Sequence, residues 1–156
     1  MDQRGIPIRR AGPADAAEIA RLLHDFNTEF SEPTLGVATL TKYARRLLEA
    51  GEMTVLLGGE GPDAIALLRF RPSVWTDALE AHLQELYVAP ALRGRGIGRA
   101  LLEASMEVAR EEGASGIDLN TGETETAART LYESCGFTNR EGEPDGPAML
   151  FYEREL

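Results

Sequence analysis

The chain has 156 residues, of which 43% are hydrophobic, so it can form one ordinary core but is too short to divide into two. Its formal charge of −10, from 26 acidic and 16 basic residues, disfavours binding to nucleic acid and favours a cationic partner. A single cysteine and two distant histidines offer neither a disulfide nor a ligand spacing for a metal. We therefore expect one metal-free domain over residues 1–156.

No stretch of the sequence reaches the roughly eighteen consecutive apolar residues of a membrane helix. The first residues, MDQRGIPIRR, also lack the apolar stretch of a secretory signal. We expect a cytoplasmic protein with no membrane partner.

The first elements in the chain are a short strand and two helices. Residues 6–9 predict the strand. Apolar residues at helical spacing from Ile19 to Phe30 predict the first helix, and a second apolar stripe predicts another over residues 39–50.

Strands follow in the middle of the chain. The apolar runs 53–57 and 64–70 are separated by GGEGPD, a strong turn sequence, and predict a hairpin. Residues 82–88 predict a third strand, which ends before Pro90 because proline cannot donate to a sheet ladder.

The remaining elements alternate between helix and strand. A helix is predicted from near Ile97 to Gly113, then a strand over 116–120, a helix over 125–135 and a closing strand over 148–153. This order predicts an α/β (α+β) fold with a mixed sheet.

The segment ALRGRGIGR before the long helix carries three glycines and three arginines between Arg93 and Arg99. Glycines let a backbone approach a ligand, and the N-terminus of a helix directs N–H groups and a positive dipole end at an anion. The alternative interpretation is a tight strand-to-helix turn with solvated arginines. The segment therefore favours, but does not by itself establish, a phosphate site.

Two familiar phosphate loops fit this segment poorly. A dinucleotide-binding loop, G-x-G-x-x-G, requires glycine at its sixth place, and with Gly94 as the first place this chain has Arg99 there. The P-loop ends in Gly-Lys-Ser or Gly-Lys-Thr, and neither triplet occurs in the chain.

The spacing R-x-x-G-x-G is filled by Arg93, Gly96 and Gly98, and here the chain resembles the GCN5-related N-acetyltransferase (GNAT) family. LYVAP at residues 86–90 and LYESCGF at 131–137 resemble that family's strand and late-helix sequences. The resemblance covers nearly the whole chain in element order. It implies a mixed, mostly antiparallel central sheet with about four helices, and an N-acetyltransferase that uses acetyl-CoA.

The resemblance also implies which residues bind acetyl-CoA. Loop amides would hold the pyrophosphate, and main-chain groups of the preceding strand would pair with pantetheine. The residues concerned are Leu86, Tyr87, Val88, Arg93, Gly94, Arg95, Gly96, Ile97, Gly98 and Arg99. Glu125 stands where the family commonly has asparagine, and Asn120 is expected to supply a compensating amide to pantetheine.

Acetyl transfer to an amine needs a base for the amine and a proton for the departing thiolate. Tyr132 matches the family position proposed to protonate the thiolate, the alternative being a helix tyrosine that packs locally. Glu85 is the candidate base, because strand alternation would place it on one face with Leu83 and Tyr87. A structural ion pair is the alternative for Glu85, and His82 and Glu80 are weaker candidate bases.

The family's acceptor pocket usually involves the first two helices and their connection. The resemblance points to Asn27, Glu29, Phe30 and Trp75 as acceptor-binding residues, although a core role is the alternative for Phe30. Cys135 is interpreted as an apolar filler and not as a nucleophile, because nothing in the sequence indicates a lowered pKa.

Three functions stay open at this point. The first is direct transfer from acetyl-CoA to a primary amine of a small, cationic molecule, in a ternary complex. The others are acetylation of a protein lysine or N-terminus, and a CoA-binding sensor without catalysis. A homodimer formed through the late strands is common in the family and stays an open alternative.

Overall fold

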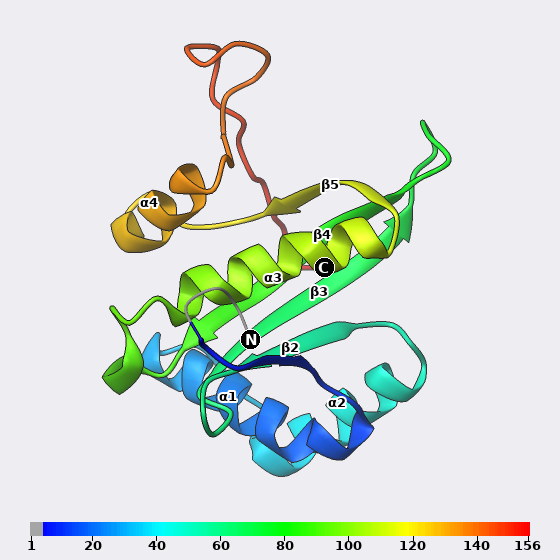
Figure 1. The fold of residues 1–156 in the computed structure, drawn as a ribbon, viewed down its shortest axis with the longest axis vertical. Helices are drawn as coiled ribbons and strands as arrows, with labels where there is room; N and C mark the ends of the chain where they lie inside the picture. The colour runs from blue at the N-terminus through cyan, green and yellow to red at the C-terminus, as the bar shows by residue number, and fades with distance from the viewer. Residues whose placement is uncertain (1–4) are drawn as a thin grey trace. The chain divides into compact units, whose positions relative to one another are not determined.

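The computed structural model describes residues 5–156, which form two compact units. The amino-terminal unit ends at Leu119, and the carboxyl-terminal unit runs from Asn120 to Leu156. The amino-terminal unit contains a five-stranded sheet in the order β1-β2-β3-β4-β5 (Figure 1). The strands are β1 (Ile8–Arg10), β2 (Thr54–Gly58), β3 (Ala64–Pro72), β4 (Leu79–Val88) and β5 (Ala114–Leu119). All neighbours are antiparallel except β4 and β5, which confirms the predicted mixed, mostly antiparallel sheet.

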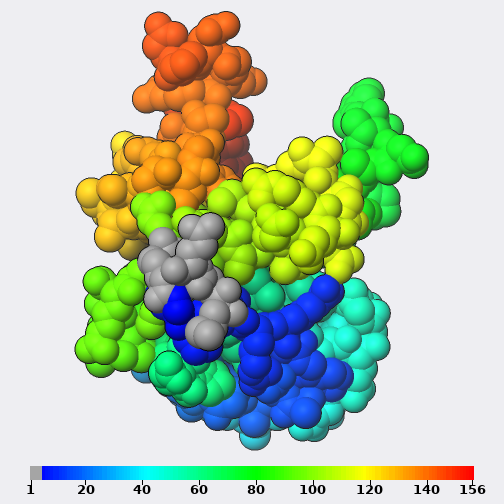
Figure 2. Space-filling view, in the orientation of Figure 1, coloured from blue at the N-terminus to red at the C-terminus, as the bar shows by residue number. Residues whose placement is uncertain are grey.

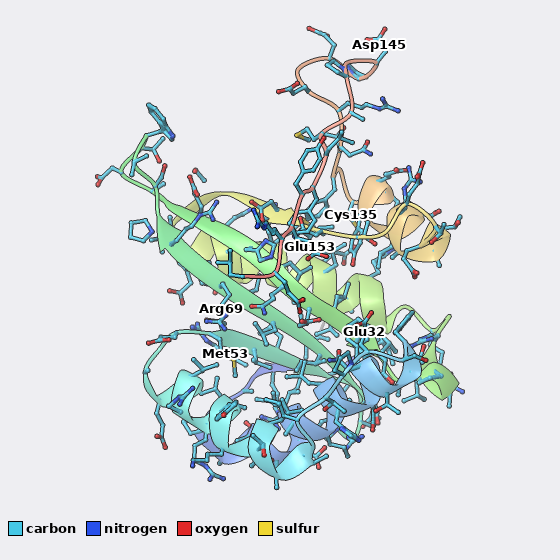
Figure 3. The ribbon with its side chains drawn as sticks, turned by 180° about the vertical axis from the view of Figure 1, so that it is seen from behind. Glu32, Met53, Arg69, Cys135, Asp145 and Glu153 are labelled. Atoms are coloured by element: carbon cyan, nitrogen blue, oxygen red, sulfur yellow. The ribbon has the colours of Figure 1, made fainter. Side chains whose placement is uncertain are left out.

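Three helices cover this sheet. They are α1 (Ala16–Glu29), α2 (Val37–Glu49) and α3 (Ile97–Glu111), with 3-10 turns η1 (Pro13–Asp15) and η2 (Pro90–Leu92). α3 lies on one face, and Figure 3 shows α1 and α2 on the other. None of the helices within residues 5–156 has the length and apolarity needed to cross a bilayer.

The core on the α1 and α2 side is built from alternate strand residues. Val55 and Leu57 of β2 and Ile65 and Leu67 of β3 pack in one buried cluster with Ile19 of α1. Residues between them face the other side, because successive strand side chains point in opposite directions.

The α3 side is packed closely at Gly58, the last residue of β2. A Cβ at Gly58 would lie 3.3 Å from Leu101 Cγ and 3.0 Å from Ile8 Cδ1. Glycine therefore allows α3 and β1 to approach the sheet here.

A β-bulge interrupts the pairing of β3 with β4. The successive residues Leu67 and Leu68 of β3 pair with Glu85 and Leu83, so β4 carries one residue more than its partner. Because cross-strand partners share a face, Glu85 lies on the α1 and α2 side with Tyr87, whereas Leu83 lies on the α3 side. The prediction that Leu83 shares a face with Glu85 is therefore wrong, since the bulge breaks the period of two.

The carboxyl-terminal unit contains α4 (Thr126–Ser134) followed by irregular structure. The predicted strand over 148–153 is wrong, because within residues 5–156 this segment pairs only through an isolated bridge between Arg140 and Ala148. The Met149 amide still donates to Asn139 O (2.7 Å), but Tyr152 is 84% exposed. Strand propensity alone does not make a strand without a paired partner.

Candidate functional site

The two halves of β4 have different partners. β4 pairs with β3 along its whole length, but it pairs with β5 only from Leu79 to Leu83. Among residues 5–119, residues 84–88 have no partner strand on the β5 side, and this change coincides with the bulge. A strand with one open side can accept an added extended chain through its backbone groups.

The open half of β4 leads directly into the glycine and arginine segment. η2 follows β4, and the chain then turns into α3 through Gly94 (φ 78°) and Gly96 (φ 85°). Gly96 is the N-cap residue of α3 and has a left-handed conformation that strains any residue with a side chain. The turn therefore requires glycine at both positions.

The backbone amides of this segment are available to a ligand. No hydrogen bond from the amides of Gly94, Gly96, Ile97 or Gly98 reaches another group within residues 5–156, and α3 has no side-chain cap. The positive end of the dipole of α3, a 15-residue helix, lies at the same point. The segment has the geometry of an anion cradle.

The arginines of the segment differ in their partners. Arg93 donates two hydrogen bonds to Glu29 at the end of α1, each 2.8 Å long. Arg95 is exposed and has no ion-pair partner within residues 5–156. Arg99 lies in the first turn of α3 and is half-buried. Arg95 is therefore the arginine whose charge is most open to an anion at the cradle.

Glu85 is the second residue of the open half of β4. Burial raises the pKa of its carboxyl above the usual value, and nearby His82 partly opposes that shift. His82 itself faces Asp118 of β5 through Nδ1. A carboxylate with a raised pKa is a stronger base than an ordinary exposed carboxylate.

The sequence matches the Acetyltransferase (GNAT) family over residues 18–137. This chain belongs to the GNAT acetyltransferase family. It is therefore an acetyltransferase, and GNAT enzymes generally use acetyl-CoA as co-substrate. The matched region includes the open half of β4, the anion cradle and all of α4.

Individual relatives agree with the GNAT assignment. A crystal structure described as an acetyltransferase from Arthrobacter sp. FB24 superposes with a TM-score of 0.88 at 48% identity, covering 96% of each chain. The uncharacterised N-acetyltransferase YhfO of Bacillus subtilis is 29% identical, over 86% of this chain and 91% of its own length. Mycothiol acetyltransferase of Beutenbergia cavernae is 31% identical over 86% of this chain, which spans only 46% of that protein.

Tyr132, the predicted acid, lies in α4 of the carboxyl-terminal unit. α4 ends in a Schellman motif, in which the Phe137 amide donates to Tyr132 O and Gly136 has φ 90°. The centres of the Phe137 and Tyr132 rings lie 6.0 Å apart, so Phe137 packs beside Tyr132 within the carboxyl-terminal unit. Burial raises the pKa of the Tyr132 phenol. Asn120, the predicted pantetheine ligand, follows β5 at the start of the same unit.

The residues predicted to bind the acceptor do not converge. Asn27 Nδ2 donates to Pro33 O (2.8 Å) and closes the turn after α1. Trp75 is 88% exposed in the β3–β4 connection, which forms the green protrusion in Figure 2. Phe30 is 45% exposed and lies edge-on to Phe26. Glu29 carries the ion pair with Arg93.

Two features of the site had no sequence signal that we recognised. One is the pairing of Glu29 with Arg93, which lies 64 residues away in the sequence. The other is the contact between His82 and Asp118, which borders a cavity of about 150 Å³ beside Arg69 and Phe70. His82 and Asp118 are register partners of β4 and β5, and that register is a property of the fold that the sequence pattern does not reveal.

Proposed function

We propose that this GNAT enzyme moves the acetyl group of acetyl-CoA to a primary amine of a small, cationic molecule, by direct attack in a ternary complex. The observation that carries the proposal is the continuity between the open half of β4 and the anion cradle. An extended pantetheine chain and a pyrophosphate need these two surfaces in this order.

In this proposal the chain holds acetyl-CoA mainly through its backbone. Main-chain groups of Leu86, Tyr87 and Val88 pair with pantetheine, and the amides from Gly94 to Gly98 hold the pyrophosphate. The exposed guanidinium of Arg95 adds a positive charge that attracts the pyrophosphate. The Asn120 amide to pantetheine stays a prediction.

The proposed acid and base have pKa shifts in useful directions. Glu85 accepts the amine proton through a water molecule, and its raised pKa makes it a stronger base that works only above that pKa. Tyr132 donates its proton to the departing thiolate, and its raised pKa keeps the phenol protonated to higher pH. Activity should therefore fall when pH drops through the pKa of Glu85 and when it rises through that of Tyr132.

The acceptor class rests on charge and on one relative. A formal charge of −10 attracts cationic amines. The similarity to mycothiol acetyltransferase supports a small-molecule acceptor, although the chain spans less than half of that protein. Acetylation of a protein amine and ligand sensing without catalysis are the alternatives that the experiment must separate.

The test follows the release of free CoA thiol from acetyl-CoA across small amines, peptides and proteins. We expect release that depends on a cationic small amine and falls about 100-fold in Tyr132→Phe, with little change in KM. Release only with peptides would favour a protein acceptor. Binding of acetyl-CoA without release in any mixture would favour the sensor.

Two further parts of the proposal concern the assembly and the location of the protein. We expect a cytoplasmic protein that forms a homodimer through its late segments, where Leu150, Phe151 and Tyr152 are exposed. Light scattering on the full chain and on a chain ending at residue 149 checks the dimer, which should be lost on truncation. A monomer at all concentrations would contradict it.

A further inference from the structure

Glu29 and Arg93 join the end of α1 to the start of the anion cradle. The carboxylate accepts two hydrogen bonds from the guanidinium, at 2.8 Å each, and a third from the Tyr87 hydroxyl at 3.3 Å. We call these three residues the Glu29 latch. In Figure 3 the segment just beyond α1, marked by Glu32, lies on the same side of the amino-terminal unit as the loop after β4.

The latch fixes Arg93 from several directions. Its Nε donates to Val88 O at 2.9 Å, across the η2 turn, while its guanidinium carbon lies 5.6 Å from the centre of the Tyr87 ring. Tyr87 is 5% exposed and stacks on Phe26 of α1 with ring centres 4.9 Å apart. An ordinary surface ion pair holds two flexible side chains only loosely, whereas this one rests on a buried aromatic stack.

The electrostatics of the latch agree with its geometry. The hydrogen bonds from Arg93 hold the pKa of the Glu29 carboxyl below its usual value, with a smaller contribution from Tyr87. The carboxylate is therefore ionised and already paired at neutral pH. The Arg93 charge is likewise engaged, so neither group is arranged as the open ligand that the sequence indicated.

The position of Arg93 connects the Glu29 latch to the anion cradle. Arg93 is the residue immediately before Gly94, and Gly94 and Gly96 are the two positive-φ residues that aim the cradle amides. A glycine-rich segment has a flexible backbone. Its amides bind an anion more tightly when the residue before the segment is held in place, because less conformational freedom is lost on binding. The Glu29 latch holds Arg93, the residue before Gly94, against the end of α1.

We propose that Glu29 is a positioning residue for the anion cradle, which it orients through Arg93 without touching the ligand. This inference rests on the proposed use of acetyl-CoA. It replaces the direct contact between Glu29 and the acceptor amine that the sequence indicated, and it makes the end of α1 a support for the cofactor loop.

The first test is calorimetric titration of the full chain with acetyl-CoA. Glu29→Gln keeps the size of the side chain and removes its charge, and we expect affinity to fall roughly three- to tenfold. KM for acetyl-CoA should rise by the same factor with kcat nearly unchanged. Because Glu29 acts only through Arg93, the double variant Glu29→Gln with Arg93→Gln should bind no worse than Arg93→Gln alone.

A matched control separates positioning from stability. Asp15 holds Arg9 by the same two-point pairing, at 2.7 and 2.9 Å, in the same unit but on β1 and η1. Asp15→Asn should lower thermal stability and leave the affinity for acetyl-CoA unchanged. If Glu29→Gln bound acetyl-CoA as tightly as the native chain and lost only as much thermal stability as Asp15→Asn, the ion pair would be purely structural. That result would overturn the inference.

A ligand-free measurement keeps the inference testable if the chain binds no acetyl-CoA. Hydrogen exchange of the amides from Arg93 to Gly98 should be several-fold faster in Glu29→Gln and unchanged in Asp15→Asn. Unchanged exchange in Glu29→Gln would overturn the latch whatever the protein binds. A rise in the KM of the amine alone would also overturn it, because it would return Glu29 to the acceptor site.

Discussion

The first half of β4, from Leu79 to Leu83, is an interior strand, whereas the second half, after the bulge, is an edge. The first half has β3 and β5 on its two sides and satisfies its backbone within the sheet. Among residues 5–119, the second half pairs only with β3, and it passes through Val88 and η2 into the cradle at Gly94. One strand thus has an interior part and an edge part.

The difference shows how a small local feature divides a strand between two roles. The bulge adds one residue to β4 at the point where β5 ends its pairing, and it turns Glu85 to the side opposite Leu83. Chemistry is therefore expected in the open half and stability in the paired half. The same substitution made in each half tests that division.

The largest expected effect comes from the two glutamates of β4. Glu85→Gln in the open half should lower kcat about 100-fold and abolish the acidic limb of the pH–rate profile. Glu80→Gln in the paired half, where Glu80 pairs with exposed Arg71, should leave both unchanged. Steady-state kinetics between about pH 5 and pH 9 compare them, and equal effects would refute the division.

The next effect contrasts the two ends of α3. Gly96 (φ 85°) begins the helix and Gly113 (φ 88°) follows its end, so alanine strains both similarly, by about 1 kcal/mol. Gly96→Ala should weaken acetyl-CoA binding at least about tenfold, because the cradle amides would no longer point at the pyrophosphate. Gly113→Ala should lower the thermal unfolding temperature as much as Gly96→Ala does but leave the affinity for acetyl-CoA unchanged. Similar affinities for acetyl-CoA in the two variants would place its binding site away from Gly96.

A smaller effect is expected from the open arginine of the cradle. Arg95→Gln should weaken acetyl-CoA binding about fivefold at low salt and less at high salt, because an exposed charge is screened. Arg45→Gln on α2 removes the same charge from another exposed position and should change nothing. Calorimetry at two salt concentrations measures both, and a salt-independent loss would argue against a charge contact.

The smallest effect concerns acid stability away from β4. Arg9 holds the pKa of Asp15 at about 2, below its ordinary value of 3.8. A depressed carboxyl pKa stabilises the fold above the ordinary value, and this contribution disappears as pH falls toward about 2. Asp15→Asn should lower thermal stability at pH 7 slightly and leave it nearly unchanged at pH 2. An equal loss at both values would contradict the assigned pairing.

Local patterns predicted much of the fold and the cradle. The spacing of Arg93, Gly96 and Gly98 indicated the phosphate segment, because glycines at a helix start let the backbone amides approach an anion closely. Apolar periodicity placed α1, α2, α3 and α4 to within a few residues.

What the sequence did not predict depends on contacts between distant residues. The bulge that separates Leu83 from Glu85 arises from the register with β3, which no period in β4 reveals. The pair of Glu29 with Arg93 joins residues 64 apart. The strand expected over 148–153 failed because pairing needs a partner as well as propensity.

The most direct test of acetyl-CoA use at the cradle is a calorimetric comparison of acetyl-CoA with acetyl-pantetheine, which lacks the pyrophosphate and the nucleotide. We expect acetyl-CoA to bind the native chain at one site, and acetyl-pantetheine to bind at least about tenfold more weakly because the cradle is left empty. Equal affinities for the two compounds, or no binding of acetyl-CoA, would contradict the assignment of the pyrophosphate to the segment from Arg93 to Gly98.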